Sequence, residues 1–350
     1  MNKRLIGFLA AVATAVSFSA CQNTKKKDSK KISIVTTIFP EYDWVMSILG
    51  ENKEDADVTM LLDKGVDLHS YQPTAEDILK ITTCDMFVYV GGESDEWVDD
   101  VLKQASNKDM VVIDLLEVLG DNVKIEEVVE GMEHEHDHDH EEEHDHEEEH
   151  DHDEDHDHEE EHDHDHEHEE PEYDEHVWLS LRHAKVICTK IEAELEKLIP
   201  EHKGIYKKNL DAYISELETL DNEYKEVVEK SSCKTILFAD RFPFRYMADD
   251  YGLTYYAAFT GCSAESEASF ETIVFLSGKV DELNLPAVLT IEGTQHKIAE
   301  TVLENASGSG KKILVMDSLQ STTGDDVKNG KTYLSVMKSN LKALKEALGA

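Results

Sequence analysis

Positive charge is scarce in this sequence. Its 34 Lys and Arg residues stand against 77 Asp and Glu residues, which gives a formal net charge of -43. Such a chain repels phosphate groups, so nucleic acid is excluded as a partner and cations are favoured. The acidity is uneven. Residues 133–170 consist only of Asp, Glu and His, and their 24 acids carry more than half of the net charge.

This Asp/Glu/His tract also lacks any apolar residue. It has no surface to bury against the entropic cost of ordering, so we expect a disordered loop. Its 14 histidines offer many weak sites for a borderline-soft ion such as zinc. Segments such as His140–His144 match the HExxH protease signature, but these copies follow from composition and have no apolar face. We therefore expect no enzymatic activity.

Long hydrophobic runs are absent except near the N-terminus. Lys3 and Arg4 precede an apolar run, Leu5–Val16, which is too short to span a bilayer permanently. The run leads into Ser19-Ala20-Cys21, an ending that resembles a bacterial lipobox. The sequence thus predicts a signal peptide at 1–20 and a lipidated Cys21 that begins a polar tether at 21–31. We expect an extracytoplasmic protein held on the cell membrane, in contact with the lipid bilayer through its N-terminal lipid.

Cysteine is also sparse, and no pair has CxxC spacing. This spacing argues against a cysteine zinc site. Cys84 and Cys188 lie in apolar patterns and are expected as buried free thiols. Cys233 and Cys262 could form a disulfide in an exported chain, and the sequence leaves this open.

Strand and helix patterns alternate in two halves. The eight predicted strands are Ile32–Ile38, Val58–Leu62, Met86–Val90, Met110–Leu115, Thr235–Ala239, Leu253–Ala258, Ala287–Ile291 and Lys312–Met316. Helical spacing separates most of them, which indicates parallel sheets flanked by helices. We predict an α/β protein of two lobes, 32–201 (with the tract as a loop) and 231–350. One long linking helix at 202–230 joins them.

Candidate ligands follow the ends of predicted strands, where open α/β sheets bind their ligands. His69, Asp240, Glu292 and Asp317 each follow a strand, and His176 precedes a helix. Imidazole and carboxylate groups that converge on a crevice between two lobes suit a divalent cation.

Five stretches resemble the metal-binding solute proteins of bacterial zinc and manganese ABC importers, across nearly the whole mature length. They are Ile34–Trp44, Leu61–Ile78, Asp85–Leu102, Asp174–Ala184 and Val315–Gln320. The resemblance implies two α/β lobes with a long connecting helix. It carries His69, His176 and Asp317 over as metal ligands.

The third ligand of that family falls at Arg241, which cannot bind a metal. We take its neighbour Asp240 as the substitute, with Glu265, Glu267 and His296 as alternatives. Two His with carboxylates suit manganese nearly as well as zinc. The tract favours zinc, because such a loop accompanies the zinc-type members of the resembling family.

The sequence therefore predicts a monomeric zinc-binding lipoprotein that delivers Zn²⁺ to the permease subunits of an ABC importer. Two alternatives stay open: a manganese-type solute-binding protein, and a surface zinc buffer or adhesin without a transport role.

Overall fold

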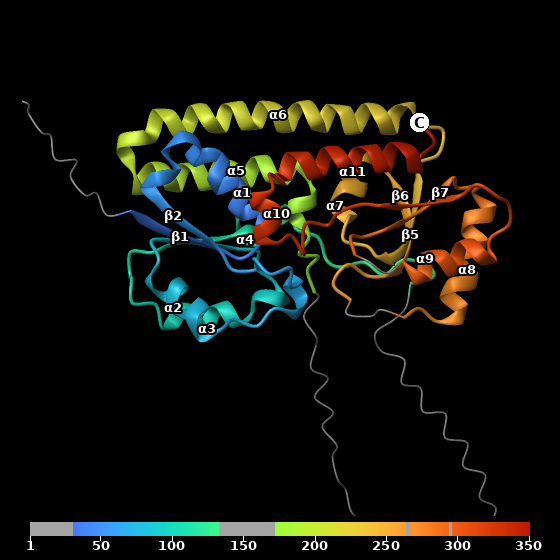
Figure 1. Ribbon diagram of the computed structural model, residues 1–350, viewed down its shortest axis with the longest axis horizontal. Coiled ribbons are helices and arrows are strands. Elements are labelled where there is room, and N and C mark those ends of the chain that lie inside the picture. Colours follow the sequence, from blue (N-terminus) through green and yellow to red (C-terminus); the bar gives the residue numbers. More distant parts are fainter. Residues whose placement is uncertain (1–30, 133–171, 264–266, 294–295) are drawn as a thin grey trace, which may run out of the picture. The chain divides into compact units, whose positions relative to one another are not determined.

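The structure is a computed structural model that describes residues 31–132, 172–263, 267–293 and 296–350. Cys21, Glu265 and the Asp/Glu/His tract lie outside the described residues. Within Lys31–Ala350 the chain forms two four-stranded parallel sheets, each flanked by helices, with one long helix between them (Figure 1). The predicted fold class is confirmed.

The first lobe holds the sheet of order β2-β1-β3-β4. Its strands are β1 (Ile32–Thr36), β2 (Ala56–Met60), β3 (Met86–Tyr89) and β4 (Val111–Asp114). Its helices are α1 (Phe39–Leu49), α2 (Ala75–Thr83), α3 (Trp97–Lys103), α4 (Leu115–Leu119) and α5 (Leu181–Leu198). The short 3-10 turn η2 (Leu68–Ser70) contains His69, and the turn η5 (Val177–Leu179) directly follows His176.

The second lobe holds the sheet of order β6-β5-β7-β8. Its strands are β5 (Thr235–Arg241), β6 (Thr254–Phe259), β7 (Ala287–Thr290) and β8 (Lys312–Val315). Its helices are α7 (Arg245–Tyr251), α8 (Phe270–Glu282), α9 (Lys297–Asn305) and α11 (Tyr333–Ala347). The short helix α10 (Gly324–Lys328) begins against the loop after β2 of the first lobe, where the Gly324 N–H donates to the Asp63 carbonyl. The central strands are buried and apolar, as both faces of a parallel sheet require.

Helix α6 (Lys203–Lys230) is the long helix of the prediction. Its buried residues recur every three or four positions, from Tyr206 to Val228, and form one apolar stripe. That stripe packs against α5 and α1 of the first lobe and against α11 of the second. Figure 1 shows α6 above both sheets, so the helix supports both lobes at once.

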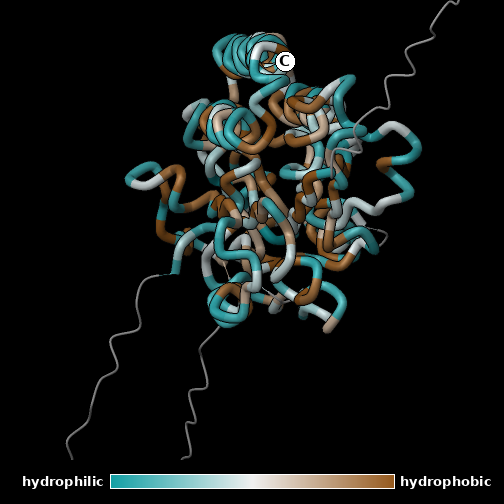
Figure 2. Tube along the Cα trace, turned by 90° about the vertical axis from the view of Figure 1, so that its left-hand side faces the viewer, coloured by the Kyte–Doolittle hydropathy of each residue, from teal (hydrophilic) through white to brown (hydrophobic). Residues whose placement is uncertain are grey.

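One hydrophobic core runs through both lobes. The Trp44 ring meets the Tyr333 ring edge-on, with centroids 5.2 Å apart, and both side chains are fully buried. A second, smaller core behind the second sheet packs α8 and α9 onto β5 and β7. Figure 2 shows hydrophobic segments gathered in the interior and hydrophilic residues over much of the outer helix surface. In the described ranges, no helix combines the length and the apolar character that crossing a bilayer requires.

Candidate metal centre

His69 and His176 lie far apart in the sequence, and their side chains meet in the structure. Their Nε2 atoms are 3.2 Å apart. His69 lies in η2 after β2, where the Asp67 side chain accepts a hydrogen bond from the backbone N–H of His69. His176 directly precedes η5 and is fully buried. Two donors on one tetrahedral zinc ion, each about 2.0–2.1 Å from it, lie roughly 3.3–3.4 Å apart, so this pair has the spacing of a shared ion.

In each histidine ring the Nδ1 atom contacts a neighbouring side chain, so Nε2 is the nitrogen that faces the other histidine. The Nδ1 atom of His176 is 3.0 Å from a carboxylate oxygen of Asp174. The Nδ1 atom of His69 is 2.8 Å from Ser94 Oγ and 3.5 Å from Glu175 Oε2. A ring that donates from Nδ1 keeps a lone pair on Nε2. With both rings donating from Nδ1, the two Nε2 lone pairs would point to one place, which is the arrangement that carboxylate–histidine–metal sites use.

The acidic partners are held by backbone. Asp174 and Glu175 are almost completely buried, and the Ser94 N–H donates to Glu175 at 2.8 Å. Gly92 makes room for this carboxylate: a Cβ at that position would lie 2.4 Å from Glu175 Oε1, and its φ of +81° disfavours any side chain. Burial, together with the neighbouring His176, lowers the pKa of His69 to about 3. His69 is therefore neutral and able to ligate at any physiological pH.

Cys262 completes the group. Among the residues that the structure describes, one set of three metal-ligating side chains brings its donor atoms within 4.8 Å of one another: His69, His176 and Cys262. Cys262 follows β6, and its Sγ adds a soft donor from the second lobe to two nitrogens of the first. Burial raises the pKa of this thiol well above its usual value, and the carboxylates of Glu126 and Glu175 raise it further.

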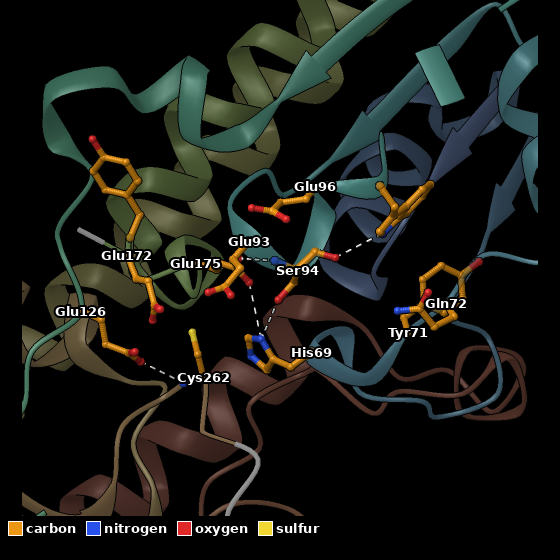
Figure 3. A pocket seen from close by; sticks show the side chains of 12 residues that line it. His69, Tyr71, Gln72, Glu93, Ser94, Glu96, Glu126, Glu172, Glu175 and Cys262 are labelled. Carbon is orange, nitrogen blue, oxygen red and sulfur yellow. Dashed lines mark hydrogen bonds and ion pairs between the residues drawn. The ribbon is translucent and has the colours of Figure 1, made fainter. Parts of the chain in front are cut away.

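An acidic cavity of about 480 Å³ leads to this group. Figure 3 shows Cys262 beside His69, with carboxylates around them. The acidic residues that line the cavity are Glu93, Glu96, Glu126, Glu172 and Glu175. Negative charge in a cleft with low-dielectric walls raises the local concentration of cations.

The structure does not bring Asp317 into the group. One of its oxygens forms an ion pair with Lys331 at 2.8 Å, and the other accepts the Leu319 N–H at 2.9 Å. Asp317 thus shapes the loop after β8 that carries Gln320. Gln320 reaches the histidines: its Nε2 atom is 2.9 Å from both Nε2 atoms.

Asp240 also lies outside the group of three. Its oxygens accept the N–H groups of Arg241, at 2.9 Å, and of Ile291, at 3.3 Å, and so tie the end of β5 to the end of β7. Arg241 forms a 2.7 Å ion pair with Asp67 across the two lobes. Of the alternatives, Glu267 is exposed and His296 lies near Asp240.

The sequence analysis missed Cys262 and Gln320 as candidates for this site. Both follow the C-terminal end of a strand, β6 for Cys262 and β8 for Gln320, so the rule that selected His69 also applies to them. Cys262 was considered only as a disulfide partner of Cys233, and in the structure both are free thiols. Cys84 and Cys188 are buried free thiols, as predicted.

Comparison with known proteins identifies the family of this chain. The family described as "Zinc-uptake complex component A periplasmic" matches residues 34–347. The chain is 32% identical to the zinc-binding lipoprotein AdcA of Streptococcus pneumoniae over 341 residues, which cover 97% of this chain and 60% of that protein. It is 30% identical to the high-affinity zinc uptake system protein ZnuA of Bacillus subtilis, with 99% of both chains covered.

Solved structures of similar proteins superimpose on this chain. The Zn(II)-bound ZnuA-like domain of S. pneumoniae AdcA superimposes with a TM-score of 0.65 at 27% identity, covering 91% of this chain and all of that domain. The metal-dependent lipoprotein YcdH of B. subtilis does so with a TM-score of 0.67 at 25% identity, with the same coverage of this chain and all of that one. The chain spans about 60% of the length of the AdcA proteins that it matches.

Proposed function

Because the chain belongs to the zinc-uptake complex component A family, we propose that it captures Zn²⁺ outside the cytoplasm and delivers it to an ABC importer. One observation carries the proposal: the Nε2 atoms of two histidines lie 3.2 Å apart, beside a cysteine thiol, at the end of an acidic cavity. The zinc-binding names of its relatives support the choice of metal.

We propose His69, His176 and Cys262 as ligands. Asp317 and Asp240, which the sequence suggested, are better suited to holding the loops around the site, because their oxygens already accept backbone N–H groups. A thiolate and two imidazoles offset part of the charge of the ion, and Asp174 and Glu175 act on it through the imidazole rings.

This ligand set favours zinc over manganese. Thiolate and imidazole are ligands that zinc accepts in tetrahedral sites, whereas manganese prefers carboxylate, carbonyl and water oxygens. Replacing the expected Asp240 by Cys262 therefore moves the site away from the manganese alternative.

The lipid anchor, the permease partner and the role of the tract are proposed from the sequence. Lipidation of Cys21 would hold a monomer on the outer face of the cell membrane, and permease subunits in that membrane would receive the ion. The Asp/Glu/His tract would gather zinc near the cavity, since the described chain resumes at Glu172, which lines it. The division into lobes 32–201 and 231–350 belongs to the same proposal.

A competition titration with a zinc chelator tests capture. The chelator is chosen to keep weak sites in the tract empty, so that only a tight site is counted. We expect one tight zinc site in the wild-type chain. His69→Ala and Cys262→Ser should each weaken it by about 100-fold or more, because each removes a ligand. Unchanged affinity in both variants, or manganese bound as tightly as zinc, contradicts the proposal.

Delivery needs a separate experiment. The loaded protein is added to vesicles that contain the ABC importer encoded by the same organism, and zinc uptake is followed with a fluorescent indicator. We expect uptake that depends on both the protein and ATP. A zinc buffer or adhesin would bind the ion equally well and give no transport.

A further inference from the structure

Arg241 lies where the two lobes meet, and its guanidinium contacts two loops that carry proposed ligands. Its Nη2 atom donates to the Asp67 carboxylate at 2.7 Å, and its Nη1 atom donates to the Ser263 carbonyl at 3.3 Å. Asp67 precedes His69 by two residues in the first lobe, and Ser263 directly follows Cys262 in the second. A guanidinium has no lone pair for a cation, so Arg241 can act on the metal centre only through these loops.

In the first lobe, Asp67 connects Arg241 to His69. Its Oδ2 atom accepts the hydrogen bond from Arg241, and its Oδ1 atom accepts the backbone N–H of His69 at 3.1 Å. This carboxylate caps the turn η2, in which His69 lies. One short side chain therefore links the guanidinium to the backbone of a proposed ligand.

In the second lobe, hydrogen bonds hold the loop after β6 on both sides of the Cys262 side chain. Arg241 donates to the carbonyl of Ser263, and a carboxylate oxygen of Glu126 accepts the N–H of Cys262 at 3.0 Å. A residue fixed at its own N–H and at the next carbonyl has little freedom to turn its side chain away. These two contacts therefore keep the thiol directed at the histidines.

The end of β5 directs Arg241 at this place. The register of β5 against β6 shifts between Phe238 and Arg241, and an irregularity of this kind changes the direction of a side chain. The side chain of Asp240 accepts the Arg241 N–H at 2.9 Å and fixes the backbone there. The side chains of Arg241 and Asp67 are only 17% and 24% exposed, so water screens their ion pair less than a pair on the surface.

We infer that Arg241 is a positioning residue for zinc capture. It ties the His69 loop of the first lobe to the Cys262 loop of the second, and so holds both ligands in place before the ion arrives. This inference rests on the proposed function. A site whose loops are already ordered does not lose affinity to their ordering when it binds. The charge of Arg241 is offset by Asp67, so the pair adds no net charge beside the ion.

Chelator competition on variants of the full chain provides the first test. Arg241→Gln should weaken zinc binding by about 10-fold or more, as is typical when a group that orients a ligand is removed. Arg241→Lys can still pair with Asp67, but a single ammonium cannot contact both loops in the same way, so its affinity should be intermediate.

Arg182→Gln is the matched control. Arg182 also forms an ion pair across the lobes, with Asp250 of α7 at 3.3 Å, and its other ionic partner is Asp221 of α6. Neither partner lies on a loop that carries a proposed ligand. Arg182→Gln should therefore leave zinc affinity within about two-fold of wild type, since exposed ion pairs contribute little.

A double-mutant cycle tests the link between the loops. Asp67→Asn keeps an oxygen for the His69 N–H and loses the ion pair, so it should weaken zinc binding about as much as Arg241→Gln. The double variant should bind no more weakly than the weaker single variant, because both changes remove the same link. Additive losses overturn the proposal. Unchanged or tighter binding in Arg241→Gln also overturns it, because a guanidinium that acts only by its charge would repel zinc.

Cobalt(II), a spectroscopic substitute for zinc, separates positioning from a general loss of stability. A thiolate-to-cobalt charge-transfer band reports whether Cys262 binds the ion. At saturating cobalt we expect this band in the wild type and in Arg182→Gln, and a weaker band in Arg241→Gln. An unchanged band in Arg241→Gln overturns the proposal. Thermal unfolding of the empty protein checks that Arg241→Gln folds, and Asp67→Asn replaces it if it does not.

The two proposals fail in different ways. If His69→Ala and Cys262→Ser leave zinc affinity unchanged, the proposed function is wrong. If those two variants lose affinity while Arg241→Gln does not, only the role of Arg241 is wrong.

Discussion

At the scale of single residues, Cys262 as a proposed ligand would couple metal binding to proton release. Burial and the carboxylates of Glu126 and Glu175 raise the pKa of its thiol, so the empty protein carries a proton on sulfur at neutral pH. Zinc binds the thiolate, and that proton must leave. His69 releases none, since burial and His176 lower its pKa to about 3.

We predict that zinc binding releases about one proton at neutral pH and that affinity rises with pH. Calorimetry in two buffers of different ionisation enthalpy measures the proton count. Cys262→Ser should abolish the release, whereas Cys233→Ser, in a half-buried thiol of the same lobe, should not. Equal release in both variants would show that the proton comes from another group.

The buried carboxyl of Asp95 leads to a second prediction at the scale of single residues, about how stability depends on pH. It is 3% exposed, and one of its oxygens accepts the N–H groups of Val90 and Gly91. Burial raises its pKa to about 7, with a further contribution from the Glu175 carboxylate and with the backbone N–H groups opposing. The folded-state pKa lies above the unfolded value, so the protonated carboxyl stabilises the fold at low pH, and this contribution is lost as pH rises through about 7.

Asp95→Asn should therefore be more stable than wild type at pH 8, by on the order of 2 kcal/mol, and close to wild type at pH 4. Thermal unfolding across that range measures the difference. Asp100→Asn, at a fully exposed position on α3, should show no such trend. A difference that does not grow with pH would mean that the Asp95 carboxyl does not titrate between pH 4 and pH 8.

At the scale of elements, the loop after β6 passes close to the His176 ring at Gly261. A Cβ on Gly261 would lie 2.9 Å from His176 Cε1 and 3.1 Å from the Phe242 carbonyl oxygen. The loop therefore contacts the imidazole directly, and it carries Cys262 as its next residue. Any side chain at 261 has to move the histidine, the loop or both.

Gly261→Ala should lower zinc affinity by about 10-fold and cost about 1–3 kcal/mol of stability, because overpacking displaces a ligand. Gly204→Ala is the matched control. No heavy atom lies within 4 Å of a Cβ at Gly204, which is in α6, so alanine should stabilise that helix by about 0.5–1 kcal/mol. Chelator competition and thermal unfolding separate the two effects, and an unaffected zinc affinity in Gly261→Ala would contradict the assigned site.

At the scale of the whole molecule, the proposed metal centre lies where the two lobes meet. His69 and His176 belong to the first lobe, and Cys262 and Gln320 to the second. The ion pair between Arg241 and Asp67 and the contact of Trp178 with Ser318 cross between the lobes at the same place. Binding an ion at such a junction stabilises the lobes against each other, which gives a permease a difference to recognise.

Deleting residues 133–170 tests whether the tract only collects zinc ions at weak sites while a separate site binds one ion tightly. We predict that the deletion leaves the affinity of the tight site within a few-fold of wild type, because none of its ligands lies in the tract. The number of weak sites should fall, and loading at low zinc should slow. Calorimetry and stopped-flow mixing with a fluorescent zinc indicator measure these quantities. Loss of the tight site on deletion would make the tract itself the principal zinc-binding element.

The sequence by itself determined the fold class and singled out two side chains, His69 and His176, that the structure brings together. Most strands of both sheets consist mainly of apolar or β-branched residues, so local pattern was enough to predict them. His69 and His176 were found because each lies in a long, specific motif. These features depend on residues close together in the chain.

Only the tertiary structure decided what completes the site. Asp240 lies at the end of β5, and Asp317, Cys262 and Gln320 follow strands of the second sheet. Sequence position cannot say which of these side chains turns toward the histidines. Asp240 and Asp317 turn to backbone N–H groups nearby, whereas Cys262 and Gln320 reach across to the first lobe. The physical reason is that a metal centre between two lobes depends on how the lobes pack, and that packing is set by contacts hundreds of residues apart in the chain, such as Trp44 against Tyr333.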